Sequence, residues 1–344
     1  MIRSTVLEKL ACQQCLSPLS AQGSSLVCQK CGMSFPVHRG LVFMGYDKSR
    51  SSEMEQIIST ERDHQTSLGR IEQQYGFAAA SFRLAHASIS VLASDVRTQG
   101  AVAVDIGSGG APMSKLLAEQ GFDTYRCELD PNSLYSGFIW EHPNLEMGKH
   151  IVCDSGILPF RDGSVDVVFC KELIHHVVEY PTIFREINRV LKIGGVFLMI
   201  EPAVALLQSF GEDDHCGHHF QTIFAYHSAL EAAGFRPFRH HLYYYKRSRR
   251  LKVLNVLKER LSSQVYSDAR MSPSVIAIRM CIQRVVGGSN TVFLTKLRAC
   301  TELEPRPSIQ IVQPSQLILE DSYLTDERVL KFREILREIV GARE

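Results

Sequence analysis

Four cysteines near the N-terminus stand in two pairs whose spacing suits a metal ion. Cys12 and Cys15 form one C-x2-C pair, and Cys28 and Cys31 form the second after twelve intervening residues. A two-residue gap lets both sulfurs of a turn point at one ion, and two facing turns complete a tetrahedral shell of thiolates for Zn2+. Gly32 permits the tight turn after the second pair. Because this shell has no open position, the predicted zinc is structural; buried thiols or a redox dithiol are the alternative.

A glycine-rich turn at 107–110 supplies a second kind of chemistry. It follows an apolar run ending at Asp105, and it contains Gly107, Ser108 and Gly109. Such a turn brings backbone N–H groups and a helix N-terminus against a ligand. A dinucleotide fingerprint would place its third glycine at position 112, where Pro112 suits the first turn of a helix instead. The carboxylate of Asp105 fits the positively charged amino-acid end of S-adenosylmethionine better than a pyrophosphate.

Two further carboxylates are expected at the ends of the next two strands. Glu128, 23 residues after Asp105, could accept both hydroxyls of a ribose, and Asp154 could meet an adenine amino group. With these residues the sequence resembles class I methyltransferases, specifically those like the ubiquinone/menaquinone-biosynthesis enzymes. The likeness runs from about Val102 to Phe235, and its motifs are Cys127 to Pro131, Asp154 to Asp166, Leu173 to Val177, Glu186 to Gly195, and Glu201-Pro202.

The resemblance implies an α/β fold with the Rossmann-like seven-stranded sheet of class I methyltransferases, its last strand antiparallel. It implies S-adenosyl-L-methionine as cofactor. Ala111 replaces the usual last glycine of the loop, and Ile193 replaces the usual proline before Gly194-Gly195. The predicted cofactor-binding residues are Asp105, Gly107, Ser108, Gly109, Glu128, Leu129, Asp154, Ser155 and Cys170.

Histidines provide the weak candidates for a catalytic base. His175 and His176 follow the fourth strand, and His215 lies in the polar segment 212–220 after the fifth. A base is required only when the acceptor holds a proton that it does not release unaided. The alternatives for the segment 212–220 are a polar loop, substrate contact, or a second metal site held by His215 and His219 on one helix face.

Alternating apolar strands and amphipathic helices must position these residues. Strands are expected at 101–105, 123–128, 150–153, 165–170, 196–200, 235–245 and 291–297, with helices beginning near Pro112, Ser133 and Pro181. Further helices are expected at 251–264, 273–285 and 326–340. The predicted organisation is a zinc ribbon at 1–45, a helical linker or cap at 46–99, a methyltransferase domain at 100–298 with a helical insertion at about 246–290, and a C-terminal extension at 299–344.

Composition limits the function classes. The 344 residues carry 38 basic and 37 acidic side chains, which argues against a surface built wholly for nucleic acid. No apolar run approaches 18 residues, so no transmembrane segment is expected, and the N-terminus lacks an apolar signal core. A cytoplasmic location is therefore predicted. Residues 236–252 hold seven basic and no acidic side chains beside several aromatic rings, which suits a sixth strand with inward aromatics, a nucleic acid, or an anionic small molecule or lipid surface.

The predicted function is S-adenosylmethionine-dependent methylation of a small molecule or biosynthetic intermediate. The first alternative is methylation of rRNA or tRNA bases, because a ribbon joined to this core also resembles the bacterial enzymes that methylate guanine in ribosomal RNA. Those enzymes have a histidine among their zinc ligands, whereas this site has four cysteines. The second alternative is a non-catalytic, cofactor-binding partner subunit. Residues 35–41 extend a resemblance to short zinc-ribbon proteins, some of which partner methyltransferases.

Overall fold

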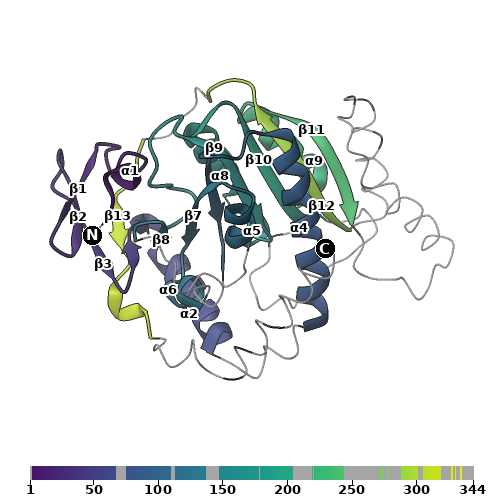
Figure 1. Ribbon diagram of the computed structural model, residues 1–344. Helices are drawn as coiled ribbons and strands as arrows, with labels where there is room; N and C mark the ends of the chain where they lie inside the picture. The colour runs from purple at the N-terminus through teal and green to yellow at the C-terminus, as the bar shows by residue number, and fades with distance from the viewer. Residues whose placement is uncertain are drawn as a thin grey trace. The chain divides into compact units, whose positions relative to one another are not determined.

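The computed structural model describes residues 2–66, 75–109, 113–136, 147–177, 179–203, 219, 221–243, 288–300 and 305–318, and the single positions 272, 274, 278, 327, 330 and 334. The chain divides into two compact units, Met1–Asp166 with Leu303–Glu344, and Val167–Glu302. Figure 1 labels the helices and strands of each unit.

The first unit is built on one sheet that includes the cysteine-rich N-terminus. Its strands follow the spatial order β1 (Leu19–Gln22), β2 (Ser25–Cys28), β3 (Ser34–His38), β4 (Leu41–Phe43), β8 (His150–Val152), β7 (Asp123–Glu128) and β6 (Val102–Ile106). The four N-terminal strands are antiparallel, and β8, β7 and β6 are parallel to one another. The predicted strands at 101–105, 123–128 and 150–153 are confirmed within a residue or two.

The strand β4 joins the ribbon to the parallel part of this sheet. It pairs in parallel with β8, with Leu41 opposite His150 and Phe43 opposite Val152. All three residues of β4 are buried, as the apolar run Leu-Val-Phe requires of a strand covered on both faces. The sheet therefore continues from the ribbon into the strands that carry the predicted cofactor residues, a pairing that the sequence did not reveal.

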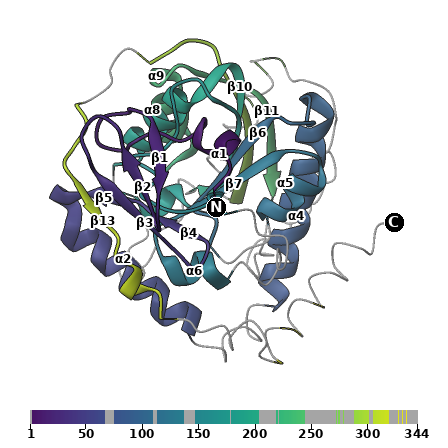
Figure 2. The same cartoon turned by 60° about the vertical axis from the view of Figure 1, so that its left-hand side comes forward.

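The helices of the first unit cover this sheet. They are α1 (Ser4–Leu7), the short 3-10 turn η1 (Lys48–Arg50), α2 (Ser51–Thr66), α4 (Tyr75–Asp95), α5 (Met113–Glu119) and α6 (Pro131–Ser136). The α6 helix begins at a carboxylate cap, because Asp130 accepts the backbone N–H of Ser133 at 2.9 Å. Figure 2 shows α2 beside β5 and α6, and α4 beside α5. The helices α2 and α4 lie within the range expected for a helical linker, and α5 and α6 begin near Pro112 and Ser133.

A C-terminal segment returns to the first unit. The strand β13 (Ile309–Ile311) pairs antiparallel with β5 (Gly45–Asp47), and the turn η3 (Pro314–Gln316) follows. Val312 and Leu317 join the apolar cluster that also contains Phe43. The side chain of Asn132 holds this segment by donating to Gln316 O at 2.9 Å and accepting from Ile318 N at 2.8 Å. The predicted closing helix at 326–340 lies almost wholly outside the described residues.

The second unit contains four strands in the order β9 (Val165–Lys171), β10 (Leu191–Ala203), β12 (Gly288–Lys296) and β11 (Phe235–Tyr243). The β12 strand is antiparallel to both β10 and β11, which confirms the expected antiparallel last strand. The other elements are η2 (Ile174–His176), α8 (Tyr180–Val190) and α9 (Ile223–Ala232). The predicted helices at 251–264 and 273–285 lie outside the described residues, apart from isolated positions.

A buried lysine fixes the end of α8 in this unit. Lys296 Nζ donates to the backbone oxygens of Asn188, at 2.6 Å, and Leu191, at 2.8 Å. A cation at the last carbonyls of a helix satisfies groups that have no partner within the helix and interacts favourably with its dipole. Within the described ranges, no helix combines the length and apolar composition needed to cross a bilayer.

Candidate cofactor and metal sites

The two cysteine pairs form matching turns in the first unit. In each turn the first cysteine's carbonyl accepts an N–H four residues on, from Leu16 at 2.8 Å and from Gly32 at 3.1 Å. Leu16 and Gly32 both have positive φ, 58° and 72°. A positive φ is readily adopted by glycine, so Gly32 suits the second turn. Leu16 adopts a positive φ in the first turn although leucine disfavours it. The sequence therefore indicated one turn by glycine and gave no sign of the other.

The four sulfurs converge on one point. Their Sγ atoms all lie within 4.8 Å of one another, with Cys12 and Cys31 3.6 Å apart and Cys15 and Cys28 3.5 Å apart. Four Zn–S bonds of ~2.3 Å in a tetrahedron separate sulfurs by about 3.8 Å, so the cluster fits zinc. Burial resists ionisation of Cys15, but hydrogen bonds involving Ser17 and the neighbouring thiols outweigh it and lower its pKa to about 6.

The glycine turn after β6 is held to β7 on both sides. Gly107 and Gly109 have φ of 61° and 50°, in the left-handed region. The amide of Gly109 donates to Glu128 Oε2 at 2.8 Å, and its carbonyl accepts from Arg126 Nη2 at 2.8 Å. Ser108 N–H donates to Cys127 O at 3.1 Å. The turn thus has a fixed backbone, and Gly110, Ala111 and Pro112 lie outside the described residues.

Asp105 and Ser108 are buried around this turn. Asp105 Oδ2 accepts a hydrogen bond from the hydroxyl of Ser114 at 2.7 Å. The Ser108 hydroxyl makes no hydrogen bond among the described residues. A buried hydroxyl without a protein partner is uncommon, and a polar ligand at this turn would satisfy it.

Glu128 ends β7 with its carboxylate held by backbone N–H groups. Besides Gly109, it accepts from Leu129 at 2.7 Å and Asp130 at 3.2 Å, both at Oε1. Burial is the main cause that raises the pKa of Glu128, and the nearby charge of Asp130 adds to it, while the N–H bonds oppose both. Leu129 is partly buried and packs against the apolar cluster that contains Phe43.

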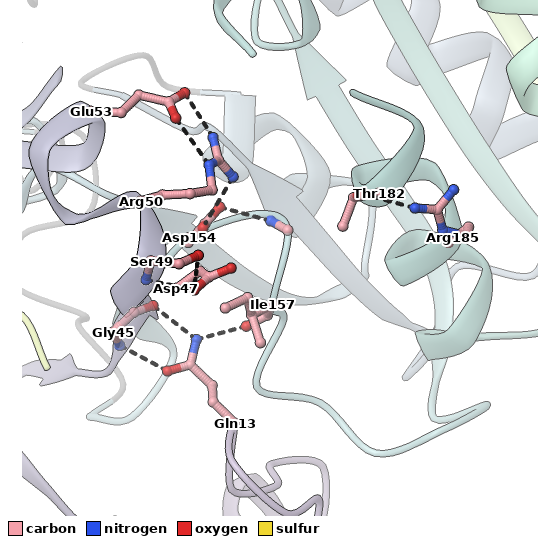
Figure 3. A network of polar contacts seen from close by, with 11 residues as sticks. Gln13, Gly45, Asp47, Ser49, Arg50, Glu53, Asp154, Ile157, Thr182 and Arg185 are labelled. Atoms are coloured by element: carbon pink, nitrogen blue, oxygen red, sulfur yellow. Dashed lines mark hydrogen bonds and ion pairs between the residues drawn. The ribbon is translucent and has the colours of Figure 1, made fainter. Parts of the chain in front are cut away.

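Asp154 and Ser155 are buried after β8. Figure 3 shows Arg50, from the segment that follows the ribbon, beside Asp154. Asp154 Oδ1 accepts from Gly156 N at 2.8 Å, and Oδ2 lies 3.7 Å from Arg50 of η1. Arg50 also forms a two-bond ion pair with Glu53, at 2.8 and 3.0 Å. Burial raises the pKa of Asp154, and Arg50 lowers it in opposition. Oδ2 makes no hydrogen bond among the described residues.

These positions fit the predicted cofactor. Asp105 lies one residue before the carboxyl end of β6, Glu128 ends β7, and Asp154 lies two residues after β8; these are three neighbouring parallel strands. Ligands of open α/β sheets bind at that edge. The Ser108 hydroxyl and Asp154 Oδ2 are two buried polar atoms there that lack hydrogen bonds within the described chain. The first unit therefore brings together every predicted cofactor residue except Cys170.

Cys170, His175 and His176 belong to the second unit. Cys170 is buried on β9, and His175 and His176 form η2 with their ring centroids 4.3 Å apart. His175 Nδ1 lies 2.8 Å from Glu201 Oε2. The other oxygen, Oε1, accepts the N–H groups of Leu173, at 2.6 Å, and Ile174, at 2.7 Å. A fully buried carboxylate thus fixes the orientation of His175, and the sequence assigned Glu201 no such part.

The polar segment 212–220 is described only at His219. Its backbone N–H donates to the carbonyl of His175. His215 lies outside the described residues, so its part as base or metal ligand stays a prediction. Among the described residues, the four cysteines are the one group of three or more such side chains placed for a metal.

The basic stretch divides at the end of β11. Arg236 is exposed, whereas Arg239 is 3% exposed, as an inward position of a strand requires. Residues 244–252, with the remaining basic side chains, lie outside the described residues. The described part therefore behaves as a strand of the sheet.

Comparison with known proteins agrees with this geometry. The fold is that of class I methyltransferases, with parallel strands, a glycine turn and acidic strand ends, and it is joined to a four-cysteine zinc ribbon. Residues 104–199 match the family described as a methyltransferase domain, and residues 3–40 match the family described as Trm112p-like protein. S-Adenosylmethionine and zinc are the cofactors that belong to these two parts.

Individual relatives are distant. An uncharacterized methyltransferase of Mycobacterium sp. (strain JLS) is 29% identical over 36% of this chain and 48% of its own. Demethylmenaquinone methyltransferase of Corynebacterium efficiens is 29% identical over 33% of this chain and 46% of its own. The chain spans about half the length of these curated relatives. A solved complex of the Haloferax volcanii Trm112 methyltransferase activator with a putative methyltransferase is 16% identical, with a TM-score of 0.48, over 70% of this chain and 98% of that one.

Proposed function

We propose that this protein transfers a methyl group from S-adenosylmethionine to a small molecule or biosynthetic intermediate. The main support is the glycine turn, which Arg126 and Glu128 hold by hydrogen bonds to Gly109. The turn lies at the carboxyl edge of the parallel strands, where Asp105 and Asp154 also lie. The matched methyltransferase domain supports the reaction. Relatives named for quinone substrates, among them a ubiquinone-biosynthesis O-methyltransferase of Methylococcus capsulatus, support a small-molecule acceptor.

Each of the three carboxylates at the strand ends could accept a hydrogen bond from a different group of the cofactor. Asp105 suits the ammonium of the cofactor's amino-acid end, Glu128 its ribose hydroxyls and Asp154 its adenine amino group. The bound cofactor supplies an electrophilic methyl group on a sulfonium. The protein's contribution to such a direct displacement is alignment and exclusion of water.

The pair formed by His175 and Glu201 supports an acceptor that must lose a proton. When Glu201 is ionised it can only accept, and the hydrogen bond at 2.8 Å then puts the proton of a neutral His175 on Nδ1. The lone pair is then on Nε2, the atom able to take a proton from an acceptor hydroxyl. We therefore assign His175 as the base and Glu201 as the residue that positions it, for an acceptor with a phenolic or enolic hydroxyl.

The direct test uses S-adenosylmethionine labelled in its methyl group. Purified protein is incubated with extract from a source strain lacking the gene, and the RNA, protein, lipid and small-molecule fractions are counted. We expect label in the small-molecule or lipid fraction. An Asp105→Ala variant should remain folded by circular dichroism and lose cofactor binding in calorimetry. Cofactor binding without label in any fraction would favour a partner subunit that is not itself catalytic.

RNA base methylation is the second candidate. The Trm112p-like match at residues 3–40 and the basic stretch beyond β11 favour it. It requires label in the RNA fraction and binding to RNA that weakens steeply with added salt. If RNA is the substrate, neutralising Arg247, Arg249 and Arg250 should reduce the salt dependence of RNA binding. If the substrate is a small molecule, the same variant should methylate it at the wild-type rate.

A further inference from the structure

We propose that the first cysteine turn positions the cofactor-binding loop through Gln13, so that tight S-adenosylmethionine binding requires the zinc-loaded ribbon. Gln13 lies between the metal ligands Cys12 and Cys15. The loop is residues 154–161, which begins at Asp154. The inference rests on the proposed function, because it assigns Asp154 to the cofactor.

Gln13 uses both ends of its side chain to hold other parts of the unit (Figure 3). Its Nε2 donates to Ile157 O at 2.6 Å and to Gly45 O at 3.0 Å, and its Oε1 accepts from Gly45 N at 2.7 Å. The side chain is 0% exposed. One of these bonds joins the cysteine turn directly to the loop at Ile157, and the other two join it to Gly45 of β5. Because the amide is buried, bonds to water do not compete with them, and they fix the position of the turn.

Gly45 carries the connection to the carboxylate itself. Its carbonyl oxygen accepts the N–H of Asp154 at 3.1 Å as well as the amide of Gln13. A Cβ atom at Gly45 would lie 2.2 Å from the backbone oxygen of Gln310 on β13. Position 45 therefore has room only for glycine. Gln13 hydrogen-bonds both the N–H and the carbonyl of Gly45, and the same carbonyl fixes the backbone of Asp154.

The rest of the loop is bound to the segment that leads into the turn. Ala11 N donates to Pro159 O at 2.9 Å, and Arg161 N donates to Lys9 O at 3.0 Å. Leu10 and Phe160 form an antiparallel bridge between these bonds. Apart from this bridge the loop has no regular secondary structure, so its position depends on the ribbon.

Zinc binding and loop position are thereby coupled. Four thiolates converge only when an ion compensates their mutual repulsion, so the bound metal fixes the backbone on both sides of Gln13. The second cysteine turn differs, since its spacers Gln29 and Lys30 are exposed. Gln29 occupies the position equivalent to Gln13 and provides a matched control.

The test compares Gln13→Leu with Gln29→Leu in the full chain. Zinc content is measured by mass spectrometry and S-adenosylmethionine affinity by calorimetry. The exchange rate of the amide hydrogens in residues 153–161 is measured on the protein without cofactor. We expect Gln13→Leu to retain zinc, to bind the cofactor about tenfold more weakly or worse because buried backbone groups lose partners, and to exchange faster in the loop. Gln29→Leu should match the wild type in all three.

A Gln13→Leu protein with zinc, unchanged affinity and unchanged exchange would overturn the proposal. If this variant does not fold, Gln13→Glu replaces it, because Glu retains the acceptor for Gly45 N and loses both donors. Chelating zinc from the wild type should also speed exchange in 153–161, and protection that persists there contradicts the coupling. A wild type that binds no cofactor would contradict the proposed function. The exchange measurements would still test whether zinc binding and the position of the loop are coupled.

Discussion

Arg126 and Glu128 stand two residues apart on β7 and hold opposite ends of one residue, Gly109. The guanidinium donates to its carbonyl and the carboxylate accepts its amide, each at 2.8 Å. Residues i and i+2 of a strand share a face, so both side chains reach the same turn. The turn's backbone is therefore held by the protein's own side chains, which reduces the ordering that cofactor binding requires.

Replacing Arg126 tests this fixation. Arg126→Met keeps the apolar length of the side chain and removes the bond to Gly109 O, leaving a partly buried carbonyl with one partner fewer. We expect the affinity for S-adenosylmethionine, measured by calorimetry, to fall about tenfold, or ~1.4 kcal/mol. Arg97→Met, at an exposed position, is the control and should leave the affinity unchanged. Equal affinities in both variants would show that the turn needs no such support.

Arg50 should set the pH dependence of cofactor binding through Asp154. Burial raises the pKa of Asp154, Asp47 and Glu53 raise it further, and Arg50 lowers it. An ionised carboxylate accepts the adenine amino group, so the affinity should fall as pH decreases through this pKa. Arg50→Met removes the lowering influence and should move that fall to higher pH.

Calorimetric titrations from mildly acidic to mildly alkaline pH provide the measurement. Lys48→Met removes a charge from the same turn, η1, at an exposed position, and its profile should follow that of the wild type. If the Arg50→Met profile also follows the wild type, Asp154 either does not contact the cofactor or does not depend on Arg50 for its charge.

Much of this architecture was predictable from local pattern. Asp105, Glu128 and Asp154 lie at or within two residues of the ends of short strands, and parallel strands bring such ends to one edge. The four cysteines were predictable because metal geometry dictates their spacing. Both signals are properties of a few adjacent residues.

The missing parts depend on contacts between distant segments. Gln13 and Arg50 are ordinary polar residues until folding places them against Gly45 and Asp154, and no spacing rule indicates that. The pairing of β4 with β8 joins residues more than a hundred positions apart. Arg126 did leave a signal, since a charge at an inward strand position needs a buried partner.

The zinc content should be close to one ion per chain, and the ribbon should depend on it. Cys31 is the exposed ligand, so Cys31→Ser removes a thiolate with little loss of packing. We expect this variant to lose zinc and to unfold about 5–10 °C lower by calorimetry. Cys300→Ser changes a cysteine outside the cluster and should retain both zinc and Tm. A folded, metal-free wild type would contradict the zinc assignment.

Glu201→Gln separates the positioning of His175 from the packing around it. The carbonyl oxygen of Gln can still accept the N–H groups of Leu173 and Ile174, while its NH2 group faces Nδ1 and favours the tautomer with the proton on Nε2. We expect unchanged affinity for the cofactor and a kcat about 10²-fold lower, because His175 no longer accepts the proton of the substrate.

Exogenous imidazole should partly restore the activity of a His175→Gly variant. Glu179→Gln, at the exposed residue before α8, should keep the wild-type rate. A normal rate in Glu201→Gln would exclude His175 as base and favour an acceptor that needs none.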